Sequence, residues 1–166
     1  MRGIPEDRLK EAERRLRRRM TALDEAREAV ADALSDATSL TGPLANTDGG
    51  SRGSGPPGER MHRGVERILD ARQRLAAAEA WETVFQRVDM DFPPGSPEGK
   101  VRDLCLVEFR GEGEKRGRPV MTLADLSRAE GVDRQTIAAR KYLILERIAY
   151  YAAESGLVKG EDTIDG

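Results

Sequence analysis

Apolar residues recur at helical spacing along most of the chain. In the first third, Leu9, Leu16, Leu23 and Val30 follow one another at seven-residue intervals. Seven-residue spacing places side chains on one face of a helix and is typical of a coiled-coil seam. The smaller members of this side are Ala12, Ala26 and Ala33, with Met20 and Leu34 beside them. We therefore expect one long helix from residue 5 to about residue 36.

A second helix is expected over residues 60 to about 88. Its apolar positions fall three or four residues apart and include Val65, Ile68, Ala71, Leu75 and Ala78. Residues 37–60 between the helices are rich in Gly, Pro and Ser without a period, which predicts a linker. Two amphipathic helices joined by a loop predict an antiparallel, coiled-coil-like hairpin, a domain of residues 5–90. Because its seam is rich in Ala, we expect the hairpin to need a second copy of the chain or another partner.

The sequence changes character after this hairpin. Asp89 and Asp91 are expected in a polar turn ahead of two prolines. Ser96 is then placed to N-cap a new helix, with Pro97 at its first position. Cys105 lies in the apolar run LCLV, so we expect a buried thiol. A charged loop, residues 111–119, leads into the last helical region.

Residues 121–149 predict two helices with a tight turn between them. Thr122 is placed to N-cap the first helix, and Gly131 to end it with a positive φ. Asp133 is the expected N-cap of the second helix. The apolar stripe of that helix is Ile137, Ile144 and Ile148. This pattern favours a helix-turn-helix domain over residues 96–156, followed by a flexible tail at 157–166.

Composition narrows the class of protein. The 166 residues carry 35% charged and only 4% aromatic side chains, which favours an all-α protein with long amphipathic helices. No apolar run approaches membrane length, so we expect a cytoplasmic protein without a membrane partner. A single Cys suits a reducing compartment. One His, one Cys and no clustered carboxylates beyond Asp89 and Asp91 predict no enzymatic activity, metal or cofactor.

The second helix of the predicted motif carries candidate DNA contacts. A recognition helix presents its first residues to base edges in the major groove, where Arg can bond guanine and Gln adenine. Cations nearby can bind phosphates. The candidate residues are Lys115, Arg116, Arg118, Thr122, Asp133, Arg134, Gln135, Thr136, Arg140 and Lys141, with Arg147 as a further phosphate contact. The alternative is a helical hairpin in an all-α core with solvated charges.

A second basic run, RRLRRR, covers residues 14–19 in the first helix. Such a run is commonly a solvated helix face. Contact with DNA phosphates or with an acidic partner is the other interpretation.

The arrangement resembles the phage-borne RinA/ArpU-type transcriptional regulators, whose C-terminal part is similar to region 4 of sigma-70 factors. The more specific part of the match is TLADLSRAEGVDRQTI, Thr122 to Ile137. The sequence departs from the family pattern at Ser127, Ala138, Ala139 and Arg140. The resemblance implies a sequence-specific DNA-binding transcriptional regulator of phage or prophage origin, acting at promoters with RNA polymerase. The alternative function is a DNA-binding oligomeric assembly protein, such as a small terminase subunit of phage DNA packaging.

Overall fold

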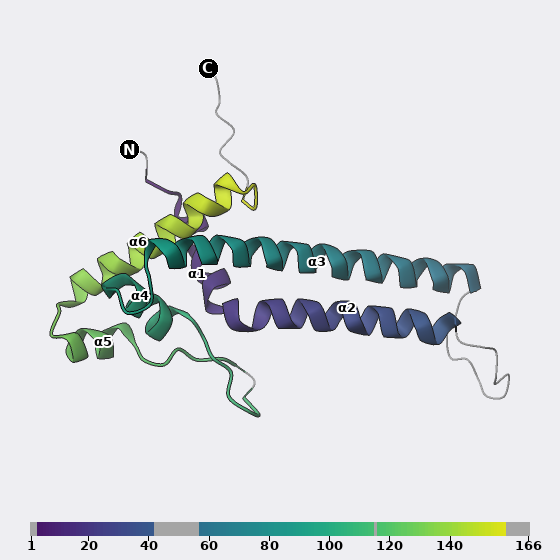
Figure 1. The fold of residues 1–166 in the computed structure, drawn as a ribbon, viewed down its shortest axis with the longest axis horizontal. Coiled ribbons are helices and arrows are strands. Elements are labelled where there is room, and N and C mark those ends of the chain that lie inside the picture. The colour runs from purple at the N-terminus through teal and green to yellow at the C-terminus, as the bar shows by residue number, and fades with distance from the viewer. Residues whose placement is uncertain (1–2, 42–56, 115, 159–166) are drawn as a thin grey trace, which may run out of the picture. The chain divides into compact units, whose positions relative to one another are not determined.

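The computed structural model describes residues 3–41, 57–114 and 116–158. Within these ranges the protein is all-α, as the sequence predicts, with one isolated antiparallel bridge between Phe109 and Arg118. The elements are α1 (Glu6–Arg17), α2 (Arg19–Thr41), α3 (Pro57–Asp91), α4 (Pro97–Val101), the π-helical turn η1 (Arg102–Leu106), α5 (Leu123–Glu130) and α6 (Arg134–Glu154) (Figure 1).

The helices group into two compact units. The first unit combines Met1–Ala22 with Glu79–Gly166, and the second is Leu23–Ala78. This grouping differs from the expected division into residues 5–90 and 96–156. The reason is that α1 and the last part of α3 pack with α4, η1 and α6 around a common core.

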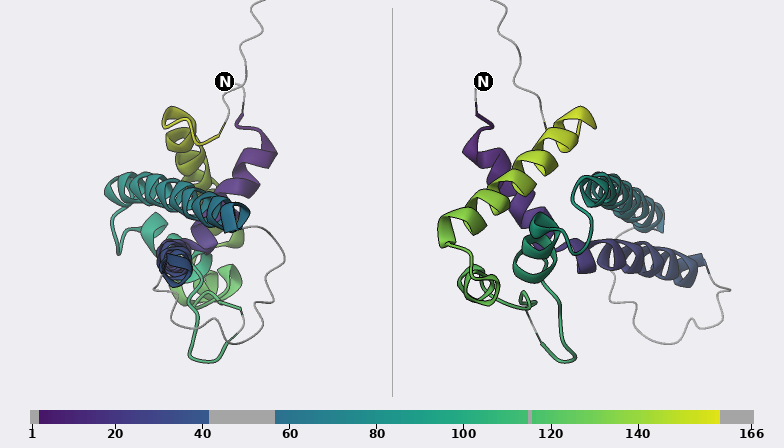
Figure 2. Two further views of the ribbon diagram at one scale, coloured as in Figure 1. Left: turned by 90° about the vertical axis from the view of Figure 1, so that its right-hand side faces the viewer. Right: turned by 60° about the vertical axis from the view of Figure 1, so that its left-hand side comes forward.

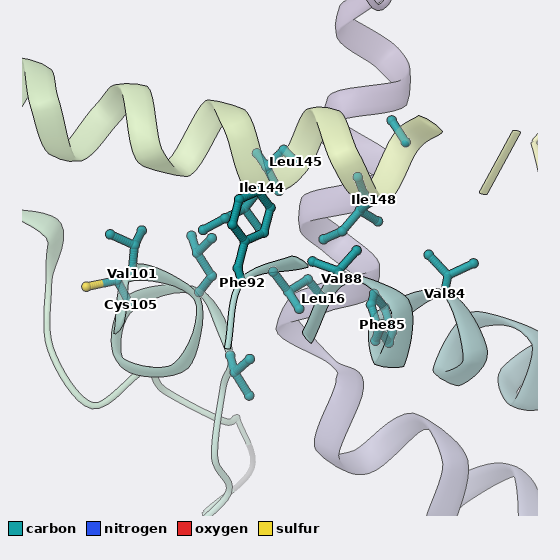
Figure 3. Close-up of a cluster of buried hydrophobic side chains, with 14 of the residues drawn as sticks. Leu16, Val84, Phe85, Val88, Phe92, Val101, Cys105, Ile144, Leu145 and Ile148 are labelled. Atoms are coloured by element: carbon teal, nitrogen blue, oxygen red, sulfur yellow. The ribbon is translucent and has the colours of Figure 1, made fainter. Parts of the chain in front are cut away.

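Segments that are distant in sequence build the core of the first unit. Figure 3 shows their apolar side chains meeting. The labelled contributors include Leu16 from α1, Val84, Phe85 and Val88 from α3, and Ile144, Leu145 and Ile148 from α6. Burying one such side chain stabilises the fold by roughly 1.5–3 kcal/mol. The predicted stripe of Ile137, Ile144 and Ile148 is confirmed, because each of the three is 0% exposed.

The expected single helix over residues 5–36 is interrupted at Arg18. This residue has φ −90° and ψ 6°, and its N–H donates to the carbonyl of Leu16. The Arg17 carbonyl accepts instead from the N–H of Glu108 at 3.0 Å. The break therefore exchanges a helical hydrogen bond for a long-range one, which the seven-residue spacing of apolar residues does not signal.

The break also divides the predicted seam. Ala12 and Leu16 are buried in the first unit, at 1% and 0% exposure, and Leu9 packs against that core. Leu23 and Val30 lie in the second unit, where both are half-buried. Apolar residues with a single seven-residue spacing thus pack in two different units.

Ser96 and Pro97 open α4 as predicted, and the Ser96 hydroxyl accepts from the N–H of Gly99 at 3.0 Å. The π-helical turn η1 follows directly. Its last hydrogen bond runs from the N–H of Val107 to the carbonyl of Arg102, five residues earlier, at 3.0 Å. The turn buries Arg102 and Cys105 together. Cys105 is 5% exposed, so the expected buried thiol is confirmed. Burial, with the charge of Asp125, raises the pKa of this thiol.

Asp89 joins two arginines inside the first unit. Arg19 donates to both of its carboxylate oxygens, at 3.0 and 2.8 Å, and also pairs with Glu82. The guanidinium of Arg102, 2% exposed, lies 2.9 Å from Asp89 Oδ1 and donates to the Phe92 carbonyl at 2.7 Å. Burial acts to lower the pKa of Arg19, but the bonds and charges of Asp89 and Glu82 outweigh it and raise the pKa.

The polar turn expected at Asp89 and Asp91 is wrong, because α3 continues through both residues. Their ion pairs hold them in the helix: Asp91 accepts from Arg147 at 3.2 Å and from the Tyr151 hydroxyl at 2.5 Å. The expected linker is also shorter than residues 37–60, since α2 runs to Thr41 and α3 begins at Pro57. The rest of that linker and the tail from residue 159 lie outside the described residues.

In the second unit, α2 and α3 run antiparallel and side by side (Figures 1 and 2). Ala71 is buried there, at 6% exposure. Several larger side chains are not: Leu34, Met61, Val65 and Leu69 are 41–61% exposed. Met61, Val65 and Leu69 are four residues apart, so they form one apolar stripe on α3.

We predict that Asp89→Asn will destabilise the first unit far more than Asp91→Asn. The first change removes one of the two carboxylates that pair with the buried Arg102 guanidinium, and Asp103 remains as the other. Losing a charged partner of this kind should cost about 1.5–3 kcal/mol. The second weakens a partly exposed pair and should cost about 1 kcal/mol or less. Urea unfolding followed by circular dichroism measures both, and equal losses would contradict the role assigned to Asp89.

Candidate nucleic-acid interface

A double cap fixes the start of α5. The Thr122 hydroxyl oxygen accepts from the N–H of Asp125 at 3.1 Å, and the Asp125 carboxylate accepts from the N–H of Thr122 at 3.2 Å. This reciprocal arrangement is a capping box. Thr122 is therefore the N-cap that the sequence predicts, and its hydroxyl is also bonded to Asp125.

The turn between α5 and α6 is short and well bonded. Gly131 ends α5 with φ 64° and ψ 28°, a left-handed conformation that side chains disfavour. The N–H of Val132 donates to the Ser127 carbonyl at 3.1 Å, and the Ser127 hydroxyl donates to the Val132 carbonyl at 2.5 Å. Asp133 then N-caps α6 by accepting from the N–H of Thr136 at 2.7 Å. The predicted positions of both caps and of the glycine are confirmed.

The first turn of α6 exposes Arg134 and Gln135. Within the described ranges, no hydrogen bond or ion pair holds the Arg134 guanidinium. Thr136 is half-buried, and its hydroxyl donates to Asp133 at 3.2 Å. Arg134 and Gln135 are thus the predicted base contacts that the structure leaves available, while Asp133 and Thr136 fix the start of the helix.

Arg140 and Lys141 occupy a different environment from the one expected of phosphate contacts. Arg140 pairs with Glu130 at 3.1 Å, and both side chains are 19% exposed. Lys141 pairs with Glu13 of α1 at 2.9 Å. These bonds fasten α6 to α5 and to α1. Arg147 likewise pairs with Asp91.

The loop before α5 is anchored by the Phe109–Arg118 bridge, with reciprocal backbone bonds of 2.9 and 3.0 Å. Arg116 and Arg118 are candidate phosphate contacts on this loop, and both are exposed. In the part of the chain that the structure describes, neither side chain has a partner. Both remain candidates, and Lys115 lies outside the described residues.

The carboxylates of this region have lowered pKa values. The backbone N–H of Thr136, followed by its hydroxyl, lowers the pKa of Asp133. Thr122 does the same for Asp125, with Arg128 adding to the effect. For Glu130, the Lys100 ammonium is the largest cause of the lowered pKa and Arg140 contributes. All three groups are therefore ionised at neutral pH.

Metal sites and membrane-spanning helices are both absent from the described residues, 3–41, 57–114 and 116–158. No group of three or more potential metal ligands occurs there. No helix in these ranges is both long enough and apolar enough to cross a membrane.

Comparison of the chain with known protein families, with curated proteins and with solved structures yields no match. The resemblance to RinA/ArpU-type regulators therefore stays a prediction, resting on the residues from Thr122 to Ile137.

We predict that the charge of Asp133, and not only its hydrogen bond, stabilises the start of α6. Asp133→Asn keeps a capping side chain but removes the negative charge at the positive end of the helix. Because the folded-state pKa of Asp133 is lowered, this contribution is present at neutral pH and is lost as pH falls through that pKa. The wild type should therefore unfold at higher urea at neutral pH, and the two curves should converge in acid. A difference independent of pH would contradict this.

Proposed function

We propose that the chain is a sequence-specific, non-enzymatic DNA-binding transcriptional regulator that reads DNA with the first turn of α6. The observation that carries the proposal is the pair of exposed side chains Arg134 and Gln135 on a firmly capped helix start. Both caps and the left-handed glycine fit a helix-turn-helix, in which the second helix enters the major groove.

The chemistry of this helix start suits base recognition. The planar guanidinium of Arg134 can bond both acceptors of a guanine edge, and the Gln135 amide can bond adenine. Arg116 and Arg118 supply phosphate contacts from the preceding loop. Arg140 and Lys141 contribute mainly by holding α6 in place through Glu130 and Glu13.

The second unit is assigned to a protein partner. Its stripe of Met61, Val65 and Leu69 is 53–61% exposed, and an exposed apolar patch is typical of an interaction site. The partners proposed to cover this stripe are RNA polymerase and a second copy of the chain. The proposals of RNA polymerase as partner, of phage or prophage origin and of a cytoplasmic location rest on the sequence alone.

The test begins by selecting preferred duplexes from a random pool with the full chain. Arg134→Ala should then weaken binding to the selected duplex by about 1–3 kcal/mol and relax preference at one base pair. Gln135→Ala should relax preference at a neighbouring pair. Arg72→Ala, which removes an exposed arginine from the second unit, is the matched control and should bind like the wild type.

Two results would count against the proposal. One is the selection of no common sequence, and the other is an Arg134→Ala variant with unchanged affinity and preference in fluorescence anisotropy. Assembly of the chain into a ring of many copies would instead favour a DNA-packaging subunit.

A further inference from the structure

The first unit has a groove with a basic lining, to which no residue of α6 contributes. It lies between α1 and the loop that carries Glu108 and Gly117, and it consists of two adjoining hollows of ≈ 380 and ≈ 230 Å³. Both hollows share Arg17, Arg18 and Glu108, so they adjoin each other at these three residues, and together we call them the basic groove.

Positive charge dominates the lining. Among the described residues, six cations line the groove against two carboxylates, Glu13 and Glu108. The cations are Lys10, Arg14, Arg17, Arg18, Arg110 and Arg116. This excess stands out because the whole chain carries a net charge of −2. The groove is therefore a local anion-attracting surface.

The cations differ in how firmly they are held. Arg17 is fixed by Glu13 at 2.6 Å and by Glu108 at 3.2 Å, so it joins the two walls of the groove. Among the described residues, Arg14 pairs with Glu11, one turn earlier on α1, and the Arg14 side chain is 68% exposed. Arg116 is exposed and has no partner within the described ranges. Arg14, on α1, and Arg116, on the loop, are therefore exposed cations of opposite walls that, among the described residues, make no bond across the groove.

The spacing on α1 suits a linear polyanion. Lys10, Arg14 and Arg18 follow at four-residue intervals, which is about 6 Å per step along a helix. Duplex DNA presents a negative charge about every 1.7 Å of its axis, so several phosphates lie within reach of such a row. Arginine also matches phosphate oxygens with two parallel hydrogen bonds.

The lining also argues against a protein segment. Its members are charged or polar side chains together with Gly117, and none is a large apolar residue. Protein interfaces usually bury an apolar and aromatic centre, which this groove does not offer.

We propose that this groove binds the phosphate backbone of duplex DNA and supplies affinity that does not depend on sequence. The inference rests on the proposed function only in taking duplex DNA as the partner. Lys141 ties the groove to the reading helix, because it pairs with Glu13, which in turn pairs with Arg17. The groove and the start of α6 thus belong to one bonded framework within the first unit.

The test compares two double variants of the full chain. Arg14→Gln with Arg116→Gln removes one exposed cation from each wall. Arg67→Gln with Arg72→Gln removes the same charge from exposed positions of the second unit. The slope of log affinity against log salt is measured for a selected duplex and for a random duplex, and equal urea midpoints verify that both variants fold.

We expect the groove variant to flatten the salt slope by about one unit for each phosphate that it no longer binds, on both duplexes alike. Its preference for the selected duplex over the random one should not change, and the control should keep the wild-type slope. An unchanged slope, or equal flattening in both double variants, overturns the proposal. So does a groove variant that stops binding a polyglutamate peptide while its DNA slope stays the same.

This outcome can be separated from failure of the proposed function. If the chain selects no preferred sequence, sequence reading by Arg134 and Gln135 fails. The groove variant should still flatten the salt slope on random duplex DNA.

Discussion

The first unit depends on one carboxylate that two guanidinium groups share. Asp89, near the end of α3, accepts from Arg19 at the start of α2 and forms an ion pair with the buried Arg102 of η1. Taking arginine charges out of water costs several kcal/mol unless an opposite charge and further hydrogen bonds compensate. Three segments, α2, α3 and η1, therefore meet at Asp89.

The sequence predicts best what neighbouring residues determine. Thr122, Gly131 and Asp133 stand where expected because capping and a left-handed φ depend on a few adjacent residues. The break at Arg18 has no such local cause. The carbonyl that it frees bonds to Glu108, far along the chain, so the seven-residue periodicity of the leucines runs through it unchanged. For the same reason, the long-range partners that hold the two aspartates in the last turns of α3 cannot be inferred from their sequence neighbours.

The same distinction between local and long-range causes applies to the candidate site. Exposure of Arg134 and Gln135 follows from their position just after a capping Asp, which the sequence shows. The ion pairs of Arg140 and Lys141 do not follow, because the two carboxylates come from α5 and α1. A charge on the expected face of a helix is thus compatible with a ligand contact or with an internal bond. Only the fold distinguishes a ligand contact from an internal bond. Here Arg140 and Lys141 form internal ion pairs.

The division of the chain into units has a consequence for the order of events during synthesis. The first unit is discontinuous, so the buried face of α1 waits for α6 to leave the ribosome before its core is complete. The second unit is one continuous segment, so it can fold as soon as that segment has been synthesised. Once α2 and α3 associate, they shorten the stretch of chain that separates α1 from the end of α3. Because closure entropy rises with loop length, early hairpin formation lowers the cost of assembling the first unit.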